Sequence, residues 1–250
     1  MQSPLQLLSS VVNILIAINI VMFIGTSGNQ SGLNDLLALH FYKNENYQVW
    51  QYVTHMFMHG SLTHLLFNML ALWMFGTQLE RVLGKSRFLL FYFACGIGAA
   101  LIYNAVNQFQ FNEVYDILVN AGISSAEISS MIAQQVYPPN ILSADQASTM
   151  LNIYHAPMVG ASGAIYGVLV AYALTFPNAK LMLIFIPYPI AAKYFVPVLI
   201  GIDLFSGVTG FSLFGGGVAH FAHVGGAIIG FILMILWRNL IKKGQSFNNF

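Results

Sequence analysis

Charged side chains are scarce in this sequence. Only 7% of the 250 residues are Asp, Glu, Lys or Arg, whereas 57% are hydrophobic and the mean hydropathy is +0.70. A soluble globular domain carries roughly a quarter charged residues, so this composition excludes one and indicates an integral membrane protein. The sequence has no basic patch of the kind that nucleic acid requires, and we expect no nucleic-acid partner.

Cysteine is nearly absent too, since Cys95 is the only one. A single cysteine excludes a disulfide within the chain, and its apolar surroundings favour a packing role. No Lys or Arg precedes the first apolar run, and no clear small-residue cleavage site follows it, so we do not expect a removable signal peptide. No low-complexity tract or repeat marks a second domain, and residues 1–250 are predicted to form one membrane domain.

Six apolar segments have the character of membrane-spanning helices. A helix needs roughly 20 mostly apolar residues to cross the hydrocarbon core of a bilayer. Residues 181–192 are apolar but too few, and they contain Pro187 and Pro189, which favours an interfacial or re-entrant stretch. The predicted fold class is an all-α membrane protein, a six-transmembrane-helix bundle. Its spans are expected at about 9–25, 58–78, 87–106, 157–176, 192–210 and 218–237.

Basic residues are unevenly divided between the two sides of such a bundle. Cytoplasmic loops carry an excess of Lys and Arg, so both termini are predicted to lie in the cytoplasm, with a multi-pass topology in a bacterial inner membrane. Eight basic residues fall on the predicted inner side, namely Arg81, Lys85, Arg87, Lys180, Lys193, Arg238, Lys242 and Lys243, whereas Lys43 alone falls on the other.

The second outer loop, at about 107–154, is predicted to form a helical insertion. Ser124 with Glu127, and Ser143 with Gln146, have the spacing of capping boxes that begin helices. The loop could recognise a substrate or cover a site, and its sequence leaves both roles open.

One serine lies among small residues where the fourth span begins, in the tetrapeptide GASG at 160–163. Alone, this pattern is equally a packing motif, because small residues let membrane helices approach closely. A serine nucleophile needs a general base and hydrogen-bond donors for the oxyanion. Gly-x-x-x-Gly faces at 163–167 and 226–230 predict that spans four and six approach closely enough to bring a base to Ser162.

Candidate partners lie at the same depth as Ser162. His64 and Asn68 are four residues apart, so they share one face of span two, and both can donate hydrogen bonds. A polar clamp between helices is the structural alternative. Ser162, His223 and His64 each lie about one turn inside the outer end of their span. This common depth predicts a nucleophile, a base and oxyanion donors in a recess that water reaches from outside.

Three separated motifs support the same interpretation. They are HGSLTHLLFN at 59–68, GASGAIYG at 160–167 and AHVGG at 222–226. Together they resemble the rhomboid family of intramembrane serine proteases. The resemblance implies that Ser162 is the nucleophile and His223 its general base, in a dyad without a carboxylate. It also implies an oxyanion hole formed by His64, Asn68 and the backbone N–H of Ser162.

Other positions match the family without a chemical role of their own. The resemblance implies that Tyr166 packs against His223 and that His59 and Gly160 shape the site. The sequence departs from the family at Gln51, where many members have arginine after the tryptophan. The expected function is therefore a serine endopeptidase that cleaves transmembrane segments of other proteins near the outer membrane face, with small residues at the cleavage point.

Two alternatives remain open. A catalytically silent relative that binds transmembrane helices would normally lack the serine or the histidine, and both are present here. A metal site is suggested by His55 with His59 and by His220 with His223, because imidazole pairs bind zinc. No acidic ligand is expected beside either pair, Asp203 has no obvious partner, and His220 is interpreted as a neighbouring polar residue. We therefore expect no metal and no cofactor.

Overall fold

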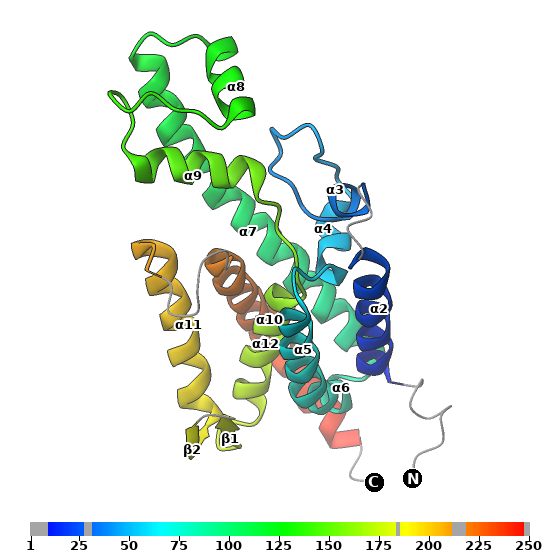
Figure 1. Cartoon of the computed structure of the whole chain (residues 1–250). Helices are drawn as coiled ribbons and strands as arrows, with labels where there is room; N and C mark the ends of the chain where they lie inside the picture. Colours follow the sequence, from blue (N-terminus) through cyan, green and yellow to red (C-terminus); the bar gives the residue numbers. More distant parts are fainter. Residues whose placement is uncertain (1–9, 28–31, 184–185, 212–218, 248–250) are drawn as a thin grey trace.

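The computed structural model describes residues 10–27, 32–183, 186–211 and 219–247, and it is mainly helical (Figure 1). Expected span starts at residues 9 and 218 lie outside the described residues. The helices are α2 (Val11–Thr26), α3 (Leu33–Leu37), α4 (Gln51–Thr54), α5 (Leu62–Ala71), α6 (Thr77–Leu83), α7 (Lys85–Asn120), α8 (Ser125–Gln134), α9 (Ala144–His155), α10 (Ser162–Thr175), α11 (Ala192–Thr209) and α12 (His220–Phe247). A 3₁₀ turn (His55–Phe57), a π-helical turn (Leu72–Gly76) and strands β1 (Lys180–Leu183) and β2 (Ile186–Ala191) complete the set.

Each of the six predicted spans coincides with helix, although their bounds differ. Within the described residues, α7, α11 and α12 are long and apolar enough to cross a membrane, whereas α2 and α10 are shorter apolar helices. The second span is a run of α5, the π-helical turn and α6, which begins at Leu62 rather than at residue 58. The six-span count therefore stays a prediction.

Helix α10 is the central element of the bundle. It packs against α12, α7 and α11, and most of its side chains are buried. A helix that is apolar on all sides belongs in an interior, because no face of it is suited to water. Cys95 of α7 is fully buried beside it, which confirms the packing role expected for this thiol.

Helix α7 is longer than the sequence led us to expect. The third span was predicted to end near residue 106, but the helix continues to Asn120. Its extension keeps a helical pattern of buried side chains at Asn107, Phe111, Val114 and Leu118 after the composition has become more polar. The helix therefore continues past the predicted end of the span into the outer insertion, which was expected to be helical.

Two short helices pack on that extension, away from the main bundle (Figure 1). Both capping boxes are confirmed, since Ser124 caps α8 with Glu127, and Ser143 caps α9 with Gln146. The hydrogen bonds from the Ser124 hydroxyl and backbone N–H hold the pKa of Glu127 below its usual value. Buried side chains of α7, α8 and α9 form a second small apolar core, so the outer insertion is a packed helical unit.

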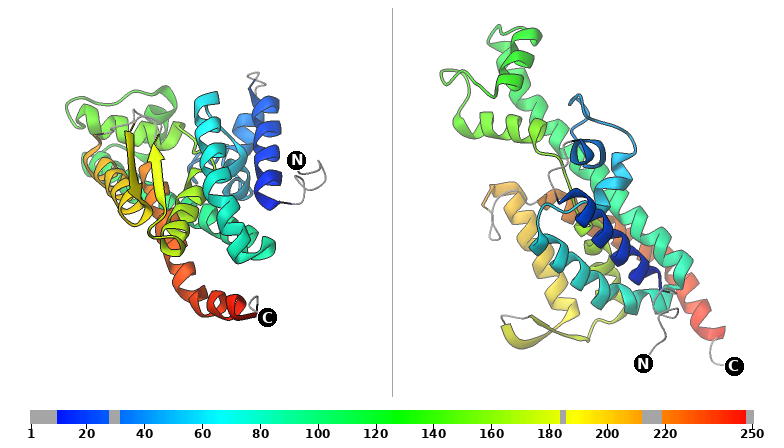
Figure 2. Two further views of the ribbon diagram at one scale, coloured as in Figure 1. Left: turned by 90° about the horizontal axis from the view of Figure 1, so that it is seen from below. Right: turned by 45° about the vertical axis from the view of Figure 1, so that its right-hand side comes forward.

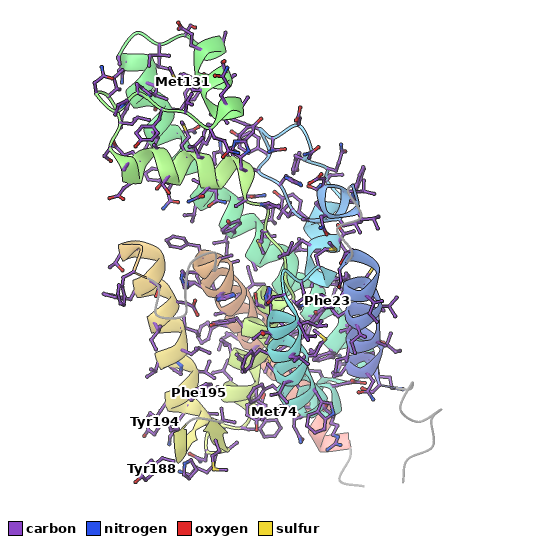
Figure 3. All side chains as sticks on the ribbon, in the orientation of Figure 1. Phe23, Met74, Met131, Tyr188, Tyr194 and Phe195 are labelled. Carbon is purple, nitrogen blue, oxygen red and sulfur yellow. The ribbon has the colours of Figure 1, made fainter. Side chains whose placement is uncertain are left out.

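The stretch from Lys180 to Ala191 is a two-stranded antiparallel hairpin, in which Leu181 pairs with Ile190. This corrects the all-α fold class. Prolines disfavour the interior of a helix but are tolerated in edge strands, which suits Pro187 and Pro189 in a two-stranded sheet. Tyr188 and Tyr194 are exposed at this end of α11 (Figure 3). Tyrosine is enriched at membrane–water interfaces, so the hairpin agrees with an interfacial position.

The hairpin, the turn between α6 and α7, the start of α2 and the end of α12 lie at one end of the molecule (Figures 1 and 2). The α8–α9 unit and α3 lie at the other. The basic residues at 81–87, 180 and 193 thus share one end, as the topology prediction requires. The side chains of Arg238, Lys242 and Lys243 lie outside the described residues.

A buried carboxylate fixes α2 at that end. Glu80 accepts hydrogen bonds from the backbone N–H groups of Val11 and Val12 at 3.0 Å, and from the Ser10 hydroxyl at 2.8 Å. Negative charge is favourable at a helix N-terminus, where backbone donors have no partners within the helix. The first span is therefore held to the second by a specific polar contact.

Candidate active site

Ser162 is the first residue of α10, and the chain reaches it through a turn that only glycine adopts readily. Gly160 has φ +122°, and its N–H donates to the carbonyl of His55 at 2.9 Å. A Cβ at this position would lie 2.8 Å from Cε1 of His64 and 3.6 Å from Oγ of Ser162. Gly160 thus leaves open the small space that His64 and Ser162 both border.

Helices α10 and α12 touch through the two predicted glycine faces. A Cβ at Gly230 would lie 2.6 Å from the Cα of Gly167, and one at Gly226 would overlap the carbonyl oxygen of Gly163. No larger residue fits between these backbones. The predicted close approach of spans four and six is therefore confirmed, and its cause is the absence of side chains at the crossing.

This approach brings a hydroxyl and an imidazole into hydrogen-bond contact. Oγ of Ser162 lies 2.9 Å from Nε2 of His223. The ring of Tyr166 stacks on the imidazole, with centroids 4.3 Å apart and planes 10° apart. Ser162, Tyr166 and His223 are all partly buried, so the pair is held in one orientation with little surrounding water.

The other nitrogen of that imidazole meets a carboxylate. Nδ1 of His223 lies 3.1 Å from Oδ1 of Asp203 on α11, and Nδ1 of His220 lies 2.6 Å from the same oxygen. The Tyr166 hydroxyl donates to Oδ2 of Asp203. Asp203, which had no obvious partner in the sequence, therefore has three, and the imidazole of the pair does contact a carboxylate. His220 lies beside His223 as a neighbouring polar residue, as expected, and shares this carboxylate.

Sequence reasoning missed this contact because it depends on how α11 is rotated against α12. The available signal was a single acidic residue inside an apolar span. Such a residue is costly in a membrane unless it faces partners, and Asp203 is only 5% exposed.

One predicted oxyanion donor, His64 of α5, borders the same space. The imidazole of His64 lies against Gly160, and the ring of His59 contacts it with centroids 5.0 Å apart. Among the described atoms, Nδ2 of Asn68 is buried without a hydrogen-bond partner, and a side-chain amide N–H can only donate. A buried donor without an acceptor costs free energy, so this group is suited to receive an oxygen from a ligand.

The cluster of Asp203, His220 and His223 also raises the question of a metal. Their ligand atoms lie within 4.8 Å of one another, so the expectation that no acidic ligand accompanies the His220–His223 pair is wrong. However, two ligands of a tetrahedral zinc ion at about 2.0–2.1 Å would lie roughly 3.3 Å apart. The 2.6 Å between His220 and Asp203 is too short for that and fits a charge-assisted hydrogen bond.

The first outer loop is organised by the residue that departs from the family pattern. Gln51 is fully buried, and its side-chain oxygen accepts from the backbone N–H groups of His40 and Gln48. Its amide nitrogen donates to carbonyl oxygens of the same loop, at Asp35, Leu36 and Asn46. A neutral amide that both donates and accepts thus holds the loop without a charge.

Comparison with known sequences shows which protein family this chain belongs to. The model of the Rhomboid domain matches residues 46–239, which is most of the chain. The chain belongs to the rhomboid family. The matched region includes the Ser162–His223 pair, the α5 donors and the outer insertion, so these features lie within the rhomboid domain.

Several rhomboid proteins are similar over parts of this chain. Rhomboid protease AarA of Providencia stuartii is 30% identical over 201 residues, which cover 75% of this chain and 56% of AarA. The mitochondrial presenilin-associated rhomboid-like protein of Rattus norvegicus is 27% identical over 76% of this chain and 38% of that protein. Rhomboid protease GlpG of Yersinia pestis is 40% identical over 86 residues, 34% of this chain and 29% of GlpG. The chain thus spans little more than half of these relatives at most.

Proposed function

We propose that this rhomboid protein is an intramembrane serine endopeptidase. The observation that carries the proposal is the 2.9 Å contact between Oγ of Ser162 and Nε2 of His223. A hydroxyl is a weak nucleophile unless a base accepts its proton, and an imidazole at hydrogen-bond distance is the usual base. Two of the similar proteins, AarA and GlpG, are rhomboid proteases, which supports this proposal.

The proposed reaction begins at the contact between Ser162 and His223. Ser162 attacks a peptide carbonyl as its hydroxyl proton passes to His223, which then gives that proton to the leaving amine. Water then attacks the acyl carbon as it loses a proton to His223, and His223 returns that proton to Oγ of Ser162 as the bond between Oγ and the acyl carbon breaks and the acid leaves. His64, Asn68 and the backbone N–H of Ser162, which has no acceptor within α10, stabilise the negative oxygen of each intermediate.

The substrate is proposed to be a transmembrane segment of another protein. The pair lies between apolar helices, so a segment that moves within the lipid bilayer can approach it from the side. A substrate helix hides its carbonyls in backbone hydrogen bonds and must unwind before attack. Segments with small or helix-breaking residues near the outer membrane face are therefore preferred.

The proposed topology has six spans in one membrane domain, with both termini in the cytoplasm of a bacterium and the site opening outward. The distribution of basic residues supports the orientation. The loops next to the site, which carry Gly160 and His59, are continuous with the end of the molecule that holds the outer insertion. Water can reach a site at that end without crossing the hydrocarbon core.

A catalytically silent protein that binds transmembrane helices is the second candidate, because some family members are named only as rhomboid-like. Cleavage of a model transmembrane substrate by the full chain in liposomes separates the two. The proposal expects cleavage by the wild type and none by Ser162→Ala. Equal cleavage by both proteins overturns the nucleophile assignment, and no cleavage by either, with substrate still bound, favours the silent candidate.

A further inference from the structure

We propose that Asp203 is a positioning residue for His223. The site then works as a Ser-His-Asp relay, by which we mean that the acid orients the base and balances its charge without taking its proton. Tyr166 and His220 hold the acid in place. The inference rests on the proposed function and names a residue that the family resemblance does not. It arises from the cluster formed where α10, α11 and α12 meet (Figure 1). Each of these helices contributes at least one member.

The geometry follows the order that a relay requires. Ser162 Oγ is 2.9 Å from Nε2 of His223, and Nδ1 of the same ring is 3.1 Å from Oδ1 of Asp203. An ionised carboxylate can only accept, so it selects the tautomer with the proton on Nδ1. Nε2 is then left with a lone pair facing the serine. Without the acid, the ring can adopt the opposite tautomer, whose Nε2 carries a proton and cannot act as a base.

The carboxylate is itself fixed by two further donors. The Tyr166 hydroxyl donates to Oδ2, and Nδ1 of His220 lies 2.6 Å from Oδ1. An acid in an apolar span is costly unless several hydrogen bonds satisfy it, and the carboxylate here has three partners. Tyr166 also stacks on His223, so one side chain sets the plane of the base and the position of the acid.

During acylation the proton on Oγ moves to Nε2 while the bond between Oγ and the substrate carbon forms. The Nδ1 proton stays between His223 and Asp203, so the carboxylate faces the positive charge that the ring gains. When the C–N bond breaks, the Nε2 proton leaves with the amine and the ring returns to its starting form. Asp203 neither gains nor loses a proton, and its effect is on orientation and charge.

A purely structural role, as a clamp between three helices, is the alternative. It predicts that loss of the acid lowers stability and leaves the chemistry of the folded protein intact. The relay predicts that kcat falls while KM and the melting temperature stay near their original values. The two roles therefore differ in which measured quantity changes.

The test compares Asp203→Asn with wild type as full chains in the same bicelles. Asn keeps the shape of the side chain but removes its charge. We expect kcat to fall by about 10²- to 10⁴-fold, the upper value being the loss for the same change in a soluble triad, with little change in KM. The rate at which a fluorophosphonate labels Ser162 should fall together with kcat. Ser206→Ala, a buried position one turn further along α11, is the matched control and should retain full activity.

Each outcome decides the inference. A folded Asp203→Asn protein with kcat within threefold of wild type overturns it, while the Ser162→Ala result still tests the proposed function separately. If Asp203→Asn does not fold, Tyr166→Phe decides, because it removes one donor to the acid and keeps the stacked ring. A fall in kcat of about fivefold or more then supports the relay, and unchanged kcat overturns it. Loss of wild-type activity in a chelator, restored by zinc, would show a metal site and also overturn it.

Discussion

The aromatic ring of Tyr166 lies nearly parallel to the imidazole of His223, 4.3 Å from centroid to centroid. The two residues come from different helices, and each is also bound to the carboxylate of Asp203. The stack therefore fixes the rotation of the ring that must face Ser162. Because a misplacement of about 1 Å in a reacting group can cost roughly 10²-fold in rate, this contact should matter for activity.

Replacement of Tyr166 by leucine tests the stack. Leucine fills much of the same space but offers no flat face, so His223 should sample other rotations. We expect kcat for a transmembrane substrate to fall by about 10- to 10²-fold, with the melting temperature reduced only slightly. Tyr172→Leu, six residues further along α10, provides a comparison that loses a ring elsewhere, where Tyr172 packs against Phe75. Equal activity of Tyr166→Leu and wild type would show that the stack is not needed.

The extent to which this site could be predicted differs between its parts. The glycine spacings on α10 and α12 encode their close approach, so the meeting of Ser162 and His223 follows from short-range patterns. The contact with Asp203 does not, because nothing in the sequence fixes the rotation of α11 about its axis. The hairpin, and the continuity of the outer insertion with α7, were not predicted for a related reason: hydropathy reports which residues avoid water, but the path of the backbone in both places depends on neighbouring elements.

Loss of an α5 donor should slow catalysis without unfolding the protein. Asn68 is buried with its Nδ2 unpaired, so its replacement by alanine removes a polar group that has no partner among the described atoms. We expect kcat to fall by about 10²- to 10³-fold while the melting temperature stays the same or rises. The measurement is cleavage of a model substrate at saturating concentration. A large loss of stability with normal kcat in the folded fraction would instead support the helix clamp.

The outer loop should become less stable as the pH falls. His40 is buried, and burial lowers its pKa below the usual 6.5 despite the nearby Asp35. Between the lowered pKa and 6.5 the unfolded chain binds more protons than the folded chain, so folding stability rises with pH in this window. Protection of loop amides from hydrogen exchange should therefore be complete above about pH 6.5 and decline below it.

The His40→Gln variant tests whether His40 causes this pH dependence, because glutamine does not titrate. Its loop protection should show a smaller change between pH 7 and pH 5 than that of the wild type. Identical pH profiles for the two proteins would assign the effect to another group.

Gln51 should stabilise the outer loop without serving the reaction. Its side chain makes five hydrogen bonds to the backbone of the loop from a fully buried position. Gln51→Leu leaves several of these groups buried and unpaired, at about 1–3 kcal/mol for each group that water cannot reach. We expect a lower melting temperature and faster proteolysis within residues 35–51. The folded fraction should retain normal kcat, and a fall in kcat with unchanged stability would contradict this division of roles.

Separation of α10 from α12 should slow the reaction of Ser162 even though no polar group is altered. A methyl group at Gly230 would lie 2.6 Å from the Cα of Gly167, and backbone atoms cannot move aside as a flexible side chain can. Gly230→Ala should force the helices apart, at about 1–3 kcal/mol in stability, and lengthen the contact between Ser162 and His223. Fluorophosphonate labelling of Ser162 should become at least about tenfold slower, since it depends on the base. Gly25→Ala on α2 is the matched control, because a Cβ there meets nothing within 4 Å. If both variants label at the wild-type rate, the glycine faces do not position the pair, and the bundle must tolerate a wider crossing than its backbone contacts imply.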